Sequence, residues 1–152
     1  MIMKRSYDGR RMEVEGWQLL VHVCRRWRNI VFGSPRRLNL QLLCTHETPV
    51  KDKLDVWPAL PLIIKGDTIL SSRMDNVIAA LEQTDHVREV AVHRLEGWQL
   101  EKVLAPMQVS FPELTGLFLS SDFGSRPIPD SFLGGSAPRL RTLLLQGIPF
   151  HF

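Results

Sequence analysis

An α/β fold with parallel strands is predicted by two observations: short apolar strands return at a regular interval, and helical patterns fill the stretches between them. The strand cores read Leu40-x-Leu42, Leu62-x-Ile64, Val90-x-Val92, Leu117-x-Leu119 and Leu143-x-Leu145. Successive cores start 22, 28, 27 and 26 residues apart. In the last three repeats a further apolar residue stands three positions earlier, at Val87, Leu114 and Leu140.

The resulting L-x-x-L-x-L pattern, with a period in the twenties, is typical of leucine-rich repeats. In such repeats a strand, a crossover and the next parallel strand form a unit that buries its apolar face against its neighbours. The sequence therefore predicts a short irregular leucine-rich-repeat solenoid over residues 38–152, capped at its N-terminal side by an amphipathic helix. A plain α/β domain with a chance period is the alternative.

The N-terminal part divides into a tail and a helical segment. Residues 1–12 are polar and rich in arginine, which predicts a disordered tail. Over residues 13–32 apolar side chains recur at spacings of three and four, which predicts an amphipathic helix within a segment 13–37. Its apolar positions are Val14, Trp17, Leu20 or Val21, Cys24, Trp27 and Val31. Gly33 followed by Pro35 predicts its end, and Cys24 is expected to be a small buried apolar residue.

Two further helices are predicted between the repeated strands. One runs from Met74 to Thr84, with apolar residues on one face and Ser71, Ser72 or Asp75 as capping residues. The other runs from Trp98 to Met107, and its apolar face consists of Leu100, Val103, Leu104 and Met107. Pro112 and Pro138 lead into the strands that follow.

Charge is unevenly distributed along the 152 residues. Residues 1–37 contain nine basic and three acidic side chains, a net charge of +6, whereas the rest contains ten basic and thirteen acidic ones, or −3. A basic N-terminal segment favours binding to an acidic protein partner or to nucleic acid.

The sequence has no apolar stretch of about 18 residues that would span a membrane, and its two cysteines suit a reducing compartment. We therefore expect a cytoplasmic or nuclear protein of one domain.

The residues 23–28, Val-Cys-Arg-Arg-Trp-Arg, resemble the last helix of an F-box. The sequence that follows resembles the F-box proteins of mushroom-forming fungi, in which an F-box precedes irregular leucine-rich repeats. The segments that carry this resemblance are "FGSPRRLNLQLLCT", "DVWPALPLIIKGD" and "PDSFLGGSAPRLRTLLLQGIPF". The resemblance covers residues 14–150. It includes only the second half of an F-box, because "MIMKRSYDGRRMEVEG" lacks the Leu-Pro opening and first apolar helix. The sequence lacks the first part of the F-box and a polar cap after the last repeat, so we expect a fragment or a shortened member of this family.

This resemblance implies a non-enzymatic substrate-recognition adaptor of a cullin–RING ubiquitin ligase. The F-box would dock on a Skp-type linker protein, and the repeats would bind a protein substrate. The residues that match the docking helix are Trp17, Leu20, Val21, Cys24, Trp27 and Arg28. The alternative is an orphan repeat scaffold without ligase docking, in which Trp17 and Trp27 pack on the first repeat. A basic-helix nucleic-acid binder is weaker, because no known nucleic-acid-binding motif accompanies the arginines.

The repeat pattern also predicts a substrate surface. Residues between the core positions of a strand point to the opposite face of the sheet. Three rows result: Ala91, Phe118 and Leu144; Glu89, Gly116 and Thr142; and His93, Ser120 and Gln146. Phe118 and Leu144 would form an exposed apolar patch, unless the loop 121–131 folds over them.

No pattern in the sequence supports an enzyme, a metal site or a cofactor. Asp122-Phe123-Gly124 matches the metal-binding tripeptide of protein kinases, but the catalytic-loop and glycine-rich motifs are absent, so we interpret it as a turn. Cys24 and Cys44 lack the spacing of a zinc site.

Overall fold

The computed structural model of this chain describes residues 21–33, 40–47, 50–56, 59–67, 69–122 and 126–149. The chain forms two compact units, residues 1–42 and 43–152, and the second contains the parallel sheet from Leu43 onward. The predicted tail 1–12, together with Trp17 and Leu20, lies outside the described residues.

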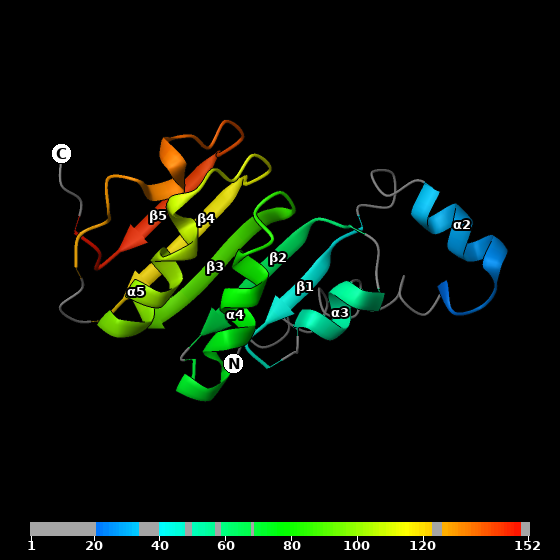
Figure 1. Cartoon of the computed structure of the whole chain (residues 1–152), viewed down its shortest axis with the longest axis horizontal. Helices are drawn as coiled ribbons and strands as arrows, with labels where there is room; N and C mark the ends of the chain where they lie inside the picture. Colours follow the sequence, from blue (N-terminus) through cyan, green and yellow to red (C-terminus); the bar gives the residue numbers. More distant parts are fainter. Residues whose placement is uncertain are drawn as a thin grey trace, which may run out of the picture. The chain divides into compact units, whose positions relative to one another are not determined.

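The sheet has five parallel strands in the order β1-β2-β3-β4-β5, so that each strand lies beside its predecessor in the sequence (Figure 1). The strands are β1 (Leu42–Thr45), β2 (Leu62–Asp67), β3 (Val87–Leu95), β4 (Gly116–Ser121) and β5 (Thr142–Gln146). The sheet is open: β1 and β5 are its two edges. The predicted α/β class with parallel strands is confirmed.

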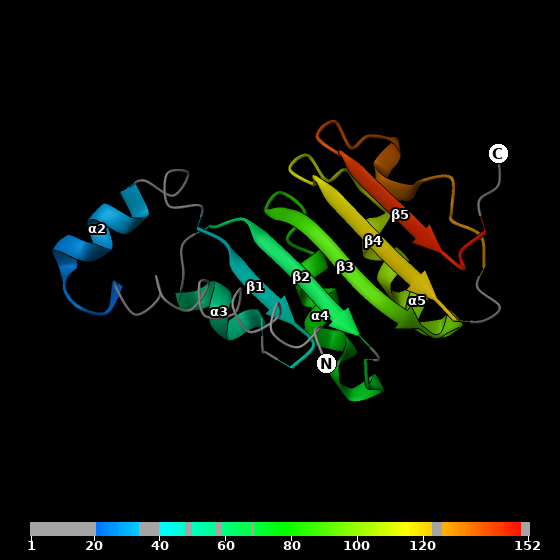
Figure 2. The same ribbon diagram turned by 180° about the vertical axis from the view of Figure 1, so that it is seen from behind.

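The crossovers carry the helices, as parallel strands require, because a tight turn cannot join them. They are α3 (Val50–Val56), α4 (Met74–Leu81) after the 3-10 turn η1 (Ser71–Arg73), and α5 (Gly97–Leu104) before the 3-10 turn η2 (Pro106–Gln108). Seen from the two sides, α4 and α5 cover one face of the sheet (Figures 1 and 2). The other face bears none of the described helices of this unit.

The core lies between the sheet and the helices. Alternate residues of each central strand are buried on that side, and the facing helix residues are buried with them. They include Leu62, Ile64, Val90, Val92, Leu117 and Leu119 from the strands and Val77, Leu81, Leu100, Val103, Leu104 and Met107 from the helical crossovers. The apolar face predicted over 98–107 is thus confirmed, although the α-helix ends at Leu104 and the last three predicted positions lie in or next to the 3-10 turn η2.

Several predicted boundaries were wrong. Strand β1 begins at Leu42, so Leu40 is buried just before the strand. Helix α4 ends at Leu81 rather than Thr84, and its N-cap residue is Arg73, which makes no side-chain cap bond. Helix α3 was not predicted, because its polar sequence Val-Lys-Asp-Lys-Leu-Asp-Val has too little apolar periodicity.

The predicted continuous helix over residues 13–32 is also wrong within the described residues. The chain leaves helical geometry at His22–Cys24, and α2 (Arg25–Gly33) begins afterwards. The Arg28 guanidinium donates from Nε to the Val21 carbonyl oxygen at 3.2 Å, across this break. Because Cys24 lies at the break, it is exposed rather than buried as predicted. The end of α2 at Gly33 agrees with the prediction.

The last repeat departs from the predicted core. Leu143 occupies a position that is fully buried in β4 as Leu117, yet it is 45% exposed. Strand β5 is an edge of the sheet and has a neighbour on one side only. Between β4 and β5 the described chain has the 3-10 turn η3 (Phe132–Gly135) in place of an α-helix, so the side chain of Leu143 is covered less.

Candidate functional site

Of the residues predicted to dock on a linker protein, the structure describes four. Val21 is buried, Cys24 is exposed, Trp27 is 47% exposed, and Arg28 is exposed while its Nε binds the Val21 carbonyl oxygen. Arg28 therefore stabilises the turn before α2, a structural contact that the spacing of the sequence did not indicate.

The exposed surface of α2 combines apolar and basic side chains. Trp27 and Ile30 are three residues apart on the helix and both are about half exposed, and Val23 is exposed just before it. Arg25 and Arg26 are exposed beside them, and Val31 is the buried residue of the helix. A single helix thus offers an aromatic anchor and flanking positive charge to solvent.

The helix-free face of the sheet carries the second predicted surface. The register pairs Glu89 with Gly116 and Gly116 with Thr142. It likewise places Ala91, Phe118 and Leu144 in a single row. Both predicted rows are confirmed as neighbours across β3, β4 and β5.

Phe118 and Leu144 differ in exposure. Leu144 is 52% exposed, so the described part of the loop 121–131 does not cover it. Phe118 is partly buried, because its ring leans over Gly116: a Cβ built there would lie 3.2 Å from the Phe118 ring. Glycine at position 116 therefore provides the room that the ring occupies.

The third predicted row is broken at its start. Strand β3 pairs with β4 through Val92 and Leu119, and the next pair is Leu95 with Ser121. Two residues of β3, His93 and Arg94, therefore oppose Ser120 alone, which is a β-bulge. Ser120 and Gln146 are paired as predicted.

This bulge forms one wall of a polar cleft of about 340 Å³ at the carboxyl ends of β2 to β5. Its lining residues are Asp67, His93, Arg94, Ser120, Ser121, Asp122 and Gln146. Three of these residues, His93, Ser120 and Gln146, belong to the predicted substrate surface, whereas Asp67, Arg94, Ser121 and Asp122 were not predicted. Their shared sequence signal is position: each lies in the last residues of a parallel strand or directly after it, and the carboxyl ends of parallel strands meet at one edge of a sheet.

Arg94 has a left-handed backbone, with φ of 55°. Such a conformation is costly for a residue with a side chain and persists only where neighbouring contacts hold it. Its amide donates to the Ser120 hydroxyl at 2.9 Å, and its guanidinium lies 3.7 Å from an Asp67 carboxylate oxygen. The bulge thus turns the Arg94 side chain toward β2.

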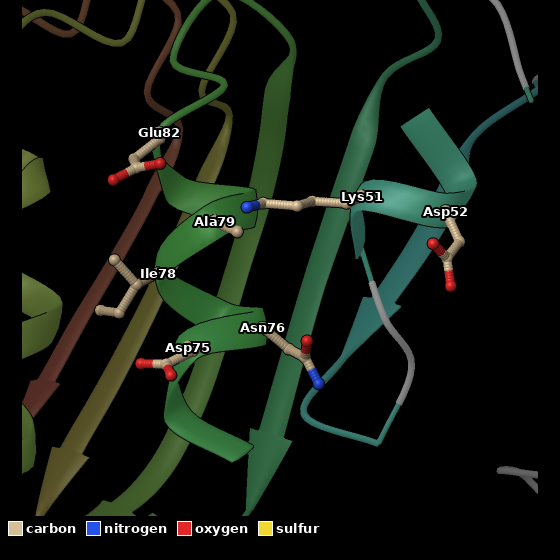
Figure 3. Close-up of a pocket in the computed structure, with 7 residues that line it drawn as sticks. All are labelled: Lys51, Asp52, Asp75, Asn76, Ile78, Ala79 and Glu82. Carbon is tan, nitrogen blue, oxygen red and sulfur yellow. The ribbon is translucent and has the colours of Figure 1, made fainter. Parts of the chain in front are cut away.

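A second depression, of about 550 Å³, lies between α3 and α4 (Figure 3). Its polar groups do not converge: Lys51 reaches toward α4, whereas Asp52 points away and Asp75 and Glu82 lie on the far side of α4. Asn76 donates to the His46 carbonyl oxygen at 3.0 Å and so connects α4 to the turn after β1. We assign this depression no binding role.

Within the described residues, no three His, Cys, Asp or Glu side chains are grouped so that they could hold a metal ion.

Burial raises the pKa of the Cys44 thiol above its ordinary value of 9.0, and nearby Lys53 partly offsets the effect. Among the helices of the described chain, none has the length and apolar character needed to cross a membrane.

The chain was compared with models of protein families, with curated proteins and with solved structures, and none of them matched.

Proposed function

We propose that this protein is a substrate-recognition adaptor of the F-box type, in which α2 docks on the Skp-type linker of a cullin–RING ubiquitin ligase and the sheet binds a protein substrate. The observation that carries the proposal is the exposure of Trp27 and Ile30 on α2 beside Arg25 and Arg26. We propose no catalytic activity for the chain.

A half-exposed tryptophan on a short helix suits a docking anchor. Tryptophan and arginine are the side chains that most often dominate the binding energy of protein interfaces. The basic flank of Trp27 would orient the helix against an acidic partner and speed the encounter. These properties agree with the Val-Cys-Arg-Arg-Trp-Arg string that resembles the last F-box helix.

The substrate-binding part is proposed to be a short, irregular leucine-rich-repeat solenoid that the N-terminal helix caps. Two features support this proposal: the sequential order of the parallel strands and the location of α4 and α5 on one face. Hydrogen bonds also join neighbouring repeats at about the repeat length, as in Thr115 to Arg88 and Ser121 to Leu95, which are 27 and 26 residues apart. Each repeat would then be stabilised by the next.

The docking proposal is tested by pull-down of a purified Skp-type linker with the full chain. We expect the wild-type chain to capture the linker and Trp27→Ala to lose at least tenfold in affinity, since it removes the aromatic anchor. Trp98→Ala is the matched control, because Trp98 is a 40% exposed tryptophan on α5, in the other unit. Failure of the wild-type chain to bind, or equal loss in both variants, would contradict docking through α2.

A second candidate is a repeat scaffold that binds a protein without joining a ligase. It is favoured by the row of Ala91, Phe118 and Leu144, which lies wholly in the unit 43–152 and does not require α2. Phe118→Glu should abolish substrate capture while circular dichroism and the unfolding midpoint stay close to wild type. If this variant unfolds instead, Phe118 is a core residue and the proposed surface is wrong.

A further inference from the structure

The cleft at the carboxyl ends of β2 to β5 joins polar groups from four neighbouring strands. Asp67 ends β2, His93 and Arg94 belong to the bulge of β3, Asp122 directly follows β4, and Gln146 ends β5. No described helix supplies a residue to the cleft. It therefore opens where the helix-free face of the sheet meets its carboxyl edge.

Charge in the cleft favours a cationic ligand. Among the described lining residues the one guanidinium is that of Arg94, which lies beside the Asp67 carboxylate, so these two charges largely offset each other. Asp122 is exposed and has no ion-pair partner among the described residues, while its amide donates to the Leu95 carbonyl oxygen at 3.2 Å. The Asp122 carboxylate therefore leaves the cleft with excess negative charge. An anion would meet two carboxylates there and is disfavoured.

An apolar contact lies one row away on the same face. Ser120 and Gln146 are paired across β4 and β5, and Phe118 and Leu144 are paired two residues earlier. Because a strand rises about 3.3 Å per residue, these rows are separated by about 6.6 Å. Side chains two residues apart on an extended peptide have the same spacing and point to the same side.

We infer that this surface binds an extended segment of a partner protein in which a lysine or arginine lies two residues from a large apolar residue. The basic side chain enters the cleft and meets Asp122, and the apolar side chain lies on Phe118 and Leu144. This inference rests on the proposed function, since it specifies the substrate class for the proposed binding face.

The experiment selects ligands from a displayed library of random heptapeptides against the full chain. We expect enrichment of basic-x-apolar sequences. Fluorescence anisotropy then compares an Arg-x-Leu peptide with the same peptide carrying glutamate for arginine. The Arg-x-Leu peptide should bind at least tenfold more tightly at low salt, and the difference should shrink as ionic strength rises.

Three variants locate the contact. Asp122→Asn should lower the affinity for the Arg-x-Leu peptide about five- to tenfold. The matched control is Asp130→Asn, which should leave this affinity unchanged because Asp130 is exposed and lies outside the cleft. Arg94→Gly should strengthen binding, because it removes the positive charge beside Asp67 and also suits the left-handed backbone. A destabilised cleft would weaken binding in both Asp122→Asn and Arg94→Gly, so opposite effects indicate charge recognition.

Selection of acidic peptides, no selection of any peptide, or equal binding by wild type and Asp122→Asn would overturn the inference. If Phe118→Glu abolishes binding of the selected peptides but Asp122→Asn does not change their affinity, the inference is overturned, whereas the proposed scaffold function is still supported. Docking on the linker is measured separately through Trp27→Ala, so its failure is distinguishable from the failure of this inference.

Discussion

The side-chain amide of Gln99 donates a hydrogen bond to the main-chain carbonyl of Ile69 at 2.6 Å, linking the start of α5 to the segment after β2, thirty residues earlier. Gln99 is 4% exposed, and its carbonyl oxygen accepts from the Glu96 amide at 2.9 Å as part of a capping box. The one buried side chain of Gln99 therefore binds both the segment after β2 and the N-terminus of α5.

Gln99→Leu should therefore lower the free energy of unfolding by about 2–3 kcal/mol, because it keeps the volume but leaves the Ile69 carbonyl and the Glu96 amide without these partners. Urea unfolding followed by circular dichroism measures the change. Gln108→Leu is the control, since Gln108 is exposed, and it should cost less than about 0.5 kcal/mol. Equal costs would contradict the role given to Gln99.

Two glycines with the same backbone angle separate conformational strain from steric overlap. Gly135 and Gly147 both have φ of 69°, but a Cβ at 135 meets nothing within 4 Å whereas a Cβ at 147 overlaps the Ser121 carbonyl oxygen. Gly135→Ala should cost about 1 kcal/mol for the left-handed conformation alone. Gly147→Ala should cost at least about 2 kcal/mol more, measured by the same unfolding assay. A smaller cost at 147 than at 135 would contradict this packing.

The paired residues Leu117 and Leu143 test the difference between a central strand and an edge strand. Leu117→Ala should lower stability by about 3–4 kcal/mol, because the side chain is fully buried and leaves a cavity. Leu143→Ala should cost about 1 kcal/mol or less, since nearly half of that side chain is already exposed. Comparable losses in the two variants would show that β5 is covered in solution.

The two cysteines should react at very different rates with a thiol reagent such as DTNB. Cys24 is exposed at the break before α2, whereas Cys44 is buried in β1. Under native conditions at neutral pH we expect one fast equivalent, abolished by Cys24→Ser, and a second only upon unfolding. Fast reaction of both thiols would contradict the burial of Cys44.

Stability should also depend on pH through Cys44. Burial raises the pKa of this thiol, so the unfolded chain loses its proton more readily than the folded one. The stabilising contribution is complete below the ordinary pKa of 9.0 and is lost as pH rises through the folded value. Above pH 9 the wild type should therefore lose stability more steeply than Cys44→Ala, as measured by urea unfolding at several pH values.

The strand predictions succeeded because burial selects the same apolar alternation in each central strand. The residues predicted to face the core in β2, β3 and β4 are buried, and the rows through Ala91 and Glu89 have the predicted partners. The same rule was wrong for Leu143, because a periodic pattern does not reveal whether a strand lies at the edge of a sheet. The apolar spacing of 13–32 likewise did not reveal the break at His22–Cys24.

The sequence by itself determined the α/β class, the parallel strands and the alternation of core and open faces, since these follow from local apolar spacing and from repetition. Only the tertiary structure decided the cleft at the carboxyl edge, where Asp67, Arg94 and Asp122 lie together although they are 27 and 28 residues apart in succession. The physical reason is that the bulge at His93 and Arg94 depends on how β3 pairs with β4 and on a left-handed backbone at Arg94. Neither feature changes the spacing of apolar residues from which the strands were predicted.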